Sequence, residues 1–329
     1  MQYSLDIKKI YINQLSKLNR AYNKGLGFAP HKPILLLSIF ELINKGEIKS
    51  NRIFITPELL ISFKDNWKKM LVTGHKENFA LPFFHLRSEP FWHLKSKNQF
   101  KDFITSSKSI KSFKSLTENV LYAEIDTGLF QLLQQPSENA FFTNLILDKY
   151  FKETKALYNK SIPSLFSEIE NQILNESPDE YVQQIKELQT KLDETDFDEE
   201  LFVRSGVFKR KIPEIYNYTC CISELKIETM GERNVQMIDA CHIVPFSISK
   251  DDTIQNGISL CPNLHRAFDR GLITINKDFI VRVSPILKEN ISNFSIRQFD
   301  GKTIKLPQYE KWYPSIEALK WHNKEIYTL

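Results

Sequence analysis

Apolar residues recur at helical spacing in two stretches of the N-terminal half of the chain. Residues 34–46 (ILLLSIFELINKG) predict a buried helix that begins near Pro33, which suits a first helical turn, and ends at Gly46. Residues 56–71 predict a second helix, because Thr56 is a suitable N-cap and a proline follows it. The first part of the chain is therefore expected to be mostly helical.

The pattern changes at residues 79–94 (FALPFFHLRSEPFWHL), which are rich in aromatic residues. A turn-like RSEP separates two similar halves, so we predict a β-hairpin or a strand–loop–strand there. Residues 100–160 are expected to be mostly helical, and residues 165–192 are expected to form a long helix broken near 176–180. Three lysines three positions apart predict a basic stripe, solvated or in contact with DNA: Lys108, Lys111 and Lys114.

The C-terminal half contains a compact alternation of strand and helix patterns. Residues 237–246 predict a strand that runs into a loop, and residues 258–261 predict a second short strand. Residues 263–270 predict a two-turn helix with Asn263 as a candidate N-cap and a glycine directly after its end. Residues 272–283 predict a hairpin. The local order is strand, strand, helix and hairpin.

The composition is typical of a soluble globular protein. It has 329 residues, of which 26% are charged and 42% are hydrophobic, a length typical of two domains. No run of eighteen apolar residues is present, and the polar start does not resemble a signal peptide, so we expect a cytoplasmic protein. The net charge of +4 permits nucleic-acid binding without demanding it.

The predicted fold class is α+β. We expect a mostly helical recognition domain with a small hairpin at residues 1–160, and a helical, acidic linker at 161–200. A domain with the strand–strand–helix element is expected at 201–329. The four cysteines, which contain no CxxC pair, are expected to be reduced and buried: Cys220, Cys221, Cys241 and Cys261.

His265 and Asp269 stand four residues apart on the predicted helix 263–270, so they share one helix face. Such a pair can hold one cation, although paired ionisable residues are also common on helix faces without a ligand. The chain upstream adds His242 on a strand and Asn256 before the next strand. Together, His242, Asn256 and His265 resemble the HNH nuclease motif, the ββα-metal fold, over about fifty residues.

The resemblance implies a hydrolase that cuts phosphodiester bonds with one divalent ion, Mg²⁺ or Mn²⁺. His242 would be the general base that takes a proton from water, a role that suits an imidazole near neutral pH. Asn256 would hydrogen-bond the backbone that orients His242, or shape the loop. The resemblance makes both residues part of the catalytic apparatus.

The same resemblance implies a metal site on the predicted helix. His265 and Asp269 would be ligands of the divalent ion. Many HNH enzymes carry Asp or His directly before the catalytic histidine, but here that position holds Cys241, and Asp239 is the nearest acid. Either Asp239 reaches the metal or water completes the ligand set; we expect Cys241 to serve in packing, and Asn263 is a competing ligand.

A second resemblance lies in the N-terminal part. GFAPHKPILLL followed by ALPFFHLRSEPFWHL resembles the sulfur-binding domain of McrA-type restriction enzymes, which recognise phosphorothioate-modified DNA, over residues 25–95. The resemblance implies that His31 and Lys32, at a helix start, and Leu81 and Pro82, in a turn, form a partly apolar cup for the sulfur. Leu81 replaces a frequent aromatic residue, and His85 stands where a small residue is expected.

Two further interpretations of this region stay open. The aromatic stretch can be core, and the basic residues can contact phosphates without reading a modification: Lys32, Arg87, His93 and Lys95. The leading hypothesis is a restriction endonuclease of the host-defence type that cuts double-stranded, phosphorothioate-modified DNA as a homodimer. The alternatives are an HNH enzyme that reads unmodified or base-modified DNA, and a DNA-binding protein with an inactive HNH module.

Overall fold

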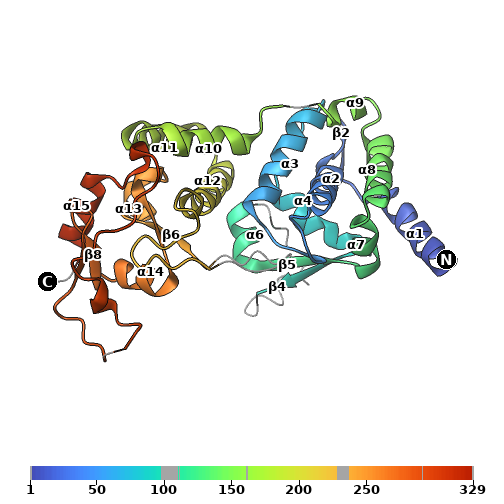
Figure 1. Ribbon diagram of the computed structural model, residues 1–329. Coiled ribbons are helices and arrows are strands. Elements are labelled where there is room, and N and C mark those ends of the chain that lie inside the picture. The colour runs from blue at the N-terminus through green and yellow to red at the C-terminus, as the bar shows by residue number, and fades with distance from the viewer. Residues whose placement is uncertain are drawn as a thin grey trace. The chain divides into compact units, whose positions relative to one another are not determined.

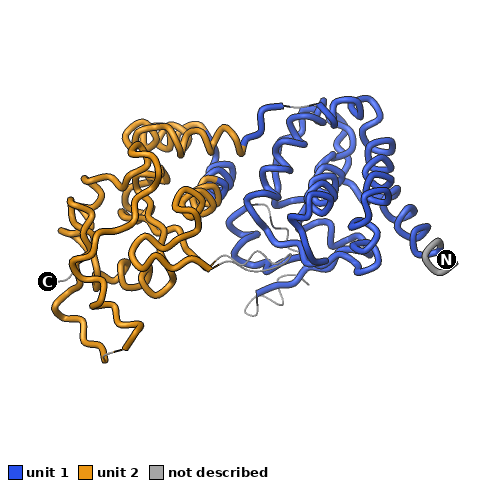
Figure 2. Tube along the Cα trace, viewed as in Figure 1, with its two compact units in different colours: residues 1–165, 192–203 blue, residues 166–191, 204–329 orange. Residues whose placement is uncertain are grey.

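The computed structural model describes residues 2–97, 110, 112–160, 162–227, 237–290 and 292–327, with side chains from residue 6 onward. The chain divides into two compact units, coloured separately in Figure 2: residues 1–165 with 192–203, and residues 166–191 with 204–329. The functional limits of the domains stay a prediction. Two lysines of the expected basic stripe, Lys108 and Lys111, lie outside the described residues.

Unit 1 combines helices with a small antiparallel sheet of order β3-β5-β4, and α2, α3 and α4 gather on one side of this sheet (Figure 1). A separate pair of short strands, β1 and β2, forms a hairpin before α2. The elements of unit 1 are α1 (Gln2–Leu15), β1 (Tyr22–Asn23), β2 (Gly27–Phe28), α2 (His31–Asn44), β3 (Arg52–Ile53), α3 (Pro57–Met70), α4 (Ala80–His85), a 3-10 turn (Leu86–Ser88), β4 (Trp92–Ser96), α6 (Phe113–Asn119), β5 (Val120–Ile125), α7 (Thr127–Leu133), α8 (Pro136–Tyr150) and α9 (Lys155–Tyr158).

The two helices predicted most directly from the sequence are confirmed. Eleven of the fourteen residues of α2 are buried, so this helix passes through the core of unit 1. The chain leaves α2 at Gly46, whose φ of +72° favours glycine. Helix α3 begins after Thr56, whose hydroxyl accepts the N–H of Leu59 at 3.2 Å and so caps the helix.

The structure corrects one prediction in unit 1. It also adds a strand to residues 100–160, whose described part is otherwise mostly helical, as expected. The first half of the expected 79–94 hairpin is helix α4, because the Asn78 side chain caps it by accepting the Leu81 N–H at 2.9 Å, and Pro82 lies in the first turn, where it breaks no helical bond. The second half is a strand, as expected. Residues 100–160 contain strand β5, which pairs with both β3 and β4 through Ala123. These pairings join distant segments, so local periodicity did not reveal them.

Unit 2 contains the strand–strand–helix element predicted from the sequence, and the expected α+β fold class is confirmed. Two antiparallel strand pairs, β6-β7 and β8-β9, stand on either side of α14 in the chain. The elements of unit 2 are α10 (Leu165–Asn175), α11 (Pro178–Lys191), β6 (Asp239–His242), α13 (Phe246–Ser249), a 3-10 turn (Ile254–Asn256), β7 (Gly257–Leu260), α14 (Pro262–Asp269), β8 (Ile273–Ile275), β9 (Val281–Val283), two further 3-10 turns (Ile296–Phe299 and Glu310–Trp312) and α15 (Ile316–Glu325).

Helices α10 and α11 match the prediction of a helix interrupted near residues 176–180. Helix α12 (Glu194–Ile215) begins within the acidic run 193–200, so most of that run is the N-terminal segment of a helix. Acidic residues in the first turn, Glu194 and Asp196, suit the positive end of the helix dipole. No described helix is long and apolar enough to cross a membrane.

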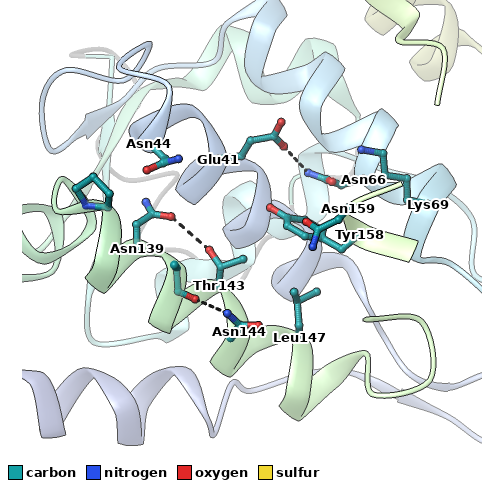
Figure 3. Close-up of a pocket in the computed structure, with 12 residues that line it drawn as sticks. Glu41, Asn44, Asn66, Lys69, Asn139, Thr143, Asn144, Leu147, Tyr158 and Asn159 are labelled. Carbon is teal, nitrogen blue, oxygen red and sulfur yellow. Dashed lines mark hydrogen bonds between the residues drawn. The ribbon is translucent and has the colours of Figure 1, made fainter. Parts of the chain in front are cut away.

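A polar cavity of about 440 Å³ lies between α2, α3 and α8 of unit 1 (Figure 3). Its side chains bond mainly to each other and to the helices. Asn66 donates to Glu41 at 3.2 Å, and Asn139 donates to the carbonyl oxygen of Phe40 at 2.9 Å, which joins α8 to α2. The polar side chains of this cavity therefore link α3 and α8 to α2 by hydrogen bonds.

Candidate functional site

Strand β6 carries the sequence Asp-Ala-Cys-His, and successive side chains of a strand point to opposite faces. Asp239 and Cys241 therefore share one face of the β6-β7 pair, and His242 belongs to the other face. His242 stands opposite Gly257 of β7 in the register of the two strands. The strand therefore places the expected metal ligand Asp239 and the expected general base His242 on opposite faces.

Helix α14 presents the predicted pair of His265 and Asp269 on one face. His265 Nε2 lies 3.4 Å from Asp269 Oδ2, as the spacing of four residues predicts. The helix ends where expected, because Gly271 has a φ of +67°. One detail of the prediction is wrong. The N-cap residue is Cys261, with Pro262 at the first helical position, so Asn263 lies inside the first turn.

Three potential ligand atoms gather between β6 and α14. The ligand atoms of Cys241, His265 and Asp269 all lie within 4.8 Å of one another. The thiol of Cys241 is buried and donates to Asp269 Oδ1 at 3.7 Å, and burial together with this carboxylate raises the pKa of the Cys241 thiol well above its usual value. Cys241 therefore packs in the core, as predicted, and also borders the cluster as a neutral thiol.

Asp239 reaches the same imidazole from the other side. Its Oδ2 lies 3.2 Å from His265 Nδ1, so the ring of His265 stands between two carboxylates. Asp239 is not part of the three-residue cluster. Its predicted role as a metal ligand stays a prediction, and the structure offers a second role, which is to fix the orientation of the His265 ring.

His242 is held by two contacts that the sequence did not reveal. Its ring stacks on Phe208 of α12, with ring centroids 4.0 Å apart and an angle of 6° between the planes. Its Nε2 lies 2.7 Å from Oδ1 of Asp252, a fully buried carboxylate. Asp252 is the main site residue that the sequence analysis missed; its only signal was an acidic pair, KDD, in a polar connection.

Asn256 links the two ends of the loop that follows β6. Its side-chain oxygen accepts the N–H of Val244 at 2.9 Å, and its amide donates to the carbonyl oxygens of Val244 and Asp251, each at 2.9 Å. The side chain is buried. These bonds hold the backbone between His242 and Asp252, while a part for Asn256 in catalysis stays a prediction.

Gly257 leaves no room for a side chain. A Cβ at this position would lie 2.1 Å from Cδ1 of Ile212 and 2.9 Å from Cε2 of Phe208, both on α12. The absence of a side chain therefore lets α12 approach β7 closely enough for Phe208 to stack on His242. A glycine of the motif region thus positions the ring that supports the imidazole.

In unit 1, five of the six predicted DNA-binding residues line one cavity of about 510 Å³. His31 and Lys32 come from α2, and Leu81, Pro82 and His85 from α4. The lining also includes four residues around the β1-β2 hairpin, Asn19, Arg20, Ala21 and Ala29, and Ser88. Arg87 is not part of the lining; its guanidinium lies 3.9 Å from the ring centre of Phe84. We call this space the reader cavity.

The predicted cations of the reader cavity are largely neutralised. Lys32 is buried, and its ammonium lies 2.5 Å from Glu89 Oε1 and 2.8 Å from the hydroxyl of Ser88. Burial lowers the pKa of His31, whose Nε2 donates to the carbonyl oxygen of Lys76 at 2.9 Å. Burial, with the nearby charges of Arg87 and Lys32, also lowers the pKa of His85. Both imidazoles are therefore neutral near pH 7.

The four cysteines are free thiols, as predicted. Cys220, Cys221 and Cys241 are buried, and Cys261 is half-buried at the start of α14. Cys220 accepts the N–H of Ser223 at 3.5 Å. Three of the four thus contribute to the packing of unit 2.

Residues 220–276 match the model of a family described as HNH endonuclease. This decides the class of the motif. The matched segment contains every residue that was predicted for the nuclease site: Asp239, His242, Asn256, His265 and Asp269. The resemblance of this segment to the HNH motif, stated from the sequence, is confirmed. Comparison with curated proteins gave no match.

Three solved structures resemble parts of the chain. The modification-dependent TagI restriction endonuclease is 19% identical over 38% of this chain and 39% of its own, with a TM-score of 0.29. The sulfur-binding domain of ScoMcrA in complex with phosphorothioated DNA is 18% identical over 43% and 87%, with a TM-score of 0.34. The phosphorothioation-dependent endonuclease ScoMcrA is 11% identical over 78% and 94%, with a TM-score of 0.33. At these values, their substrates do not transfer to this chain, which spans well under half of TagI.

Proposed function

We propose that the chain is a metal-dependent DNA endonuclease whose HNH segment hydrolyses phosphodiester bonds. The observation that carries the proposal is the match of residues 220–276, together with the contact between His242 and the buried Asp252. Hydrolysis needs a base for the attacking water and positive charge near the phosphate. The side chains on the two faces of β6 are suited to these two tasks.

His242 acts as the general base in this proposal. A buried carboxylate beside Nε2 favours the tautomer with the proton on that nitrogen, so Nε2 donates to Asp252 and Nδ1 is left to accept a proton from water. The stack on Phe208 limits rotation of the ring. Asp252 and Phe208 therefore position the base, and only His242 contacts the reacting water.

The cluster of β6 and α14 suits a divalent ion by the chemistry of its donors. His265 offers an imidazole nitrogen and Asp269 a carboxylate, a pair that Mn²⁺ or Mg²⁺ accepts, while the sulfur of Cys241 is a soft donor that suits hard cations poorly. A bound ion would supply positive charge at the scissile phosphate and the leaving oxygen. Asp239 would orient His265 through Nδ1 or join the ligand set.

We further propose that unit 1 directs the nuclease to modified DNA, with a phosphorothioate as the leading target. Two features support this: the HKP and ALPF segments that resemble a sulfur-binding domain, and their meeting in one cavity with apolar walls from Leu81 and Pro82. Sulfur is larger and less hydrated than oxygen, so an apolar wall favours it. Base-modified and unmodified DNA are the alternative targets. Cleavage of both strands with one site per chain calls for a homodimer.

The test is a cleavage assay with matched duplexes. Duplexes that differ only in carrying phosphorothioate linkages, methylated cytosine or no modification are incubated with Mg²⁺ or Mn²⁺. Wild-type protein is compared with His242→Ala, and with Asp300→Asn as a control that changes a carboxylate of unit 2 outside the candidate site. The proposal expects cleavage of the phosphorothioate duplex that is lost only in His242→Ala.

The other outcomes separate the two halves of the proposal. Equal cleavage of every duplex, again lost in His242→Ala, keeps the nuclease and rejects the reading of sulfur. Cleavage of only the methylated duplex selects a base modification. Binding without cleavage of any duplex, with Mg²⁺, Mn²⁺ and Ni²⁺ each present, favours a DNA-binding protein with an inactive HNH segment.

A further inference from the structure

We propose that Arg20, at the rim of the reader cavity, is the residue that anchors a DNA phosphate to unit 1. Arg20 belongs to neither of the motifs that carry the family resemblances. The proposal rests on the proposed DNA-reading role of unit 1, and it assigns the cation on which that role depends. The contact partner is a phosphate of the DNA backbone beside the cavity.

The balance of charge around the reader cavity points to Arg20. DNA binding draws much of its free energy from cations placed on phosphates. Lys32 is held by Glu89, which also accepts the N–H of Asn19 at 3.1 Å, and the two histidines of the cavity are neutral. Arg20 is thus the one lining residue of the reader cavity whose cation is not matched by a described carboxylate.

Two aromatic rings hold the side chain of Arg20. Its guanidinium lies 5.0 Å from the ring centre of Phe28 and 4.6 Å from that of Tyr150. The hydroxyl of Tyr150 accepts the N–H of Leu18 at 3.0 Å and donates to the carbonyl oxygen of Leu15 at 2.7 Å, which fixes this ring. Aromatic faces hold a guanidinium in place without using its N–H donors. Arg20 is therefore oriented in advance, and its donors stay available to a phosphate.

Among the residues that the structure describes, no carboxylate lies within ion-pair distance of Arg20. Partial burial lowers the pKa of Arg20, but a guanidinium stays charged at neutral pH. A half-buried cation without an acidic partner is unfavourable in the free protein. An anion that arrives at this site removes that cost, which favours binding of a phosphate there.

Arg20 also lies between two cavities of unit 1. Arg20 lines both the reader cavity and a neighbouring cavity of about 320 Å³, so it stands where the two meet. The second cavity is also bordered by Lys149 and Lys152, both exposed, and by one acid, Glu153. Cations therefore continue beyond Arg20 along the surface of unit 1, as a bound DNA strand would require.

The β1-β2 hairpin completes the rim with exposed aromatic side chains. Tyr22 is 63% exposed and Phe28 is 56% exposed, and their rings meet edge to face at 4.9 Å. The turn between the strands is fixed by Asn23, whose side-chain oxygen accepts the N–H groups of Gly25 and Leu26. A rigid hairpin with exposed rings suits contact with the sugars and bases that flank the anchored phosphate.

The test replaces Arg20 with methionine, which keeps an unbranched stem between the two rings but removes the charge. The matched control is Arg52→Met. The guanidinium of Arg52 also lies over a ring, that of Tyr122 at 5.2 Å, but it is paired with Glu124 at 3.2 Å. Arg20→Lys keeps the charge. Binding is measured by fluorescence anisotropy without divalent metal, so that no DNA is cut.

A phosphate anchor acts on every duplex equally. We expect Arg20→Met to bind modified and unmodified duplexes about tenfold more weakly at low salt, because a charged hydrogen bond is lost. The slope of log affinity against log salt should fall by about 0.9, the value of one phosphate contact. Arg52→Met should match the wild-type protein, and Arg20→Lys should keep the wild-type slope.

Three results would overturn the proposal in different ways. If wild-type protein binds DNA and Arg20→Met keeps both its affinity and its salt slope, Arg20 is not the anchor, while the proposed function stands. If wild-type protein binds none of the duplexes, the DNA-reading role of unit 1 and the anchor are both rejected. A loss confined to the phosphorothioate duplex would make Arg20 part of the sulfur site instead.

Discussion

The histidines of the two units are held in opposite ways. In the HNH segment, His242 and His265 each contact a carboxylate, at 2.7 Å from Asp252 and 3.2 Å from Asp239. In the reader cavity, His31 donates to the carbonyl oxygen of Lys76 at 2.9 Å, and burial lowers the pKa of both His31 and His85. A histidine whose ring is oriented by acids suits proton transfer or metal binding. A neutral histidine in an apolar wall suits recognition by shape.

The strongest test of this comparison is removal of the proposed base. His242→Ala should lower the cleavage rate by about 10²- to 10⁴-fold, the usual contribution of general acid–base catalysis. Affinity for DNA, measured without metal, should stay unchanged, because recognition is assigned to unit 1. Single-turnover cleavage and anisotropy measure the two quantities separately. Equal losses of rate and affinity would place His242 in DNA binding instead.

The next effect concerns Lys32, which we expect to act in stability more than in DNA binding. Lys32→Met leaves the buried carboxylate of Glu89 without its cation, which should lower the free energy of unfolding by about 3 kcal/mol. The double variant Lys32→Met/Glu89→Gln should recover most of this loss. Urea unfolding of the three proteins measures it. A stable Lys32→Met protein with weak DNA binding would instead return Lys32 to the phosphate contacts.

A smaller effect is expected at Asp252, which positions the base without touching substrate. Asp252→Asn keeps the shape of the side chain but removes the charge that favours the proton on Nε2 of His242. Cleavage should slow by about 10- to 100-fold with unchanged DNA affinity. Asp300→Asn, a carboxylate of unit 2 that accepts the Val283 N–H, is the control. Loss of folding in Asp252→Asn, seen by circular dichroism, would show a structural role alone.

The smallest expected effect concerns the pH dependence of DNA affinity, to which the histidines of the reader cavity should contribute little. A histidine with an ordinary pKa gains charge as the pH falls from about 8 to about 6, and its attraction to DNA rises. The lowered pKa values of His31 and His85 keep both neutral over most of this range. The double variant His31→Gln/His85→Gln should therefore show the same pH dependence of DNA affinity as wild type, to within about twofold. A clear difference would mean that these histidines take up protons when DNA binds.

Local sequence signals were sufficient for much of the fold. Helices α2 and α3, the hairpin of β8 and β9 and the His265–Asp269 pair all depend on neighbours within a few residues. Helix α4 was missed because all of residues 79–86 except Leu81 and His85 are buried, so their apolar run fits a strand as well as a helix. Strand β5 was missed because its partners β3 and β4 come from distant segments.

The same distinction explains the candidate sites. The motif identified His242 and His265 as candidates, but the ring that supports His242 comes from elsewhere, because Phe208 stands 34 positions before it. In the reader cavity, likewise, Glu89 stands 57 positions after its partner Lys32. No local pattern distinguishes Asp252 from other acids in a polar loop. Pairs such as these become visible only when the chain is folded.

The flat contact between Phe208 and His242 has a consequence for ionic strength. Added salt screens charges, so it weakens the attraction of cations to DNA, but it does not weaken the van der Waals contact between two stacked rings. If the chain binds DNA as proposed, Phe208 should keep the imidazole in place even at salt concentrations that release the DNA. When DNA is saturating, the rate of cleavage should depend on salt much less than the affinity does.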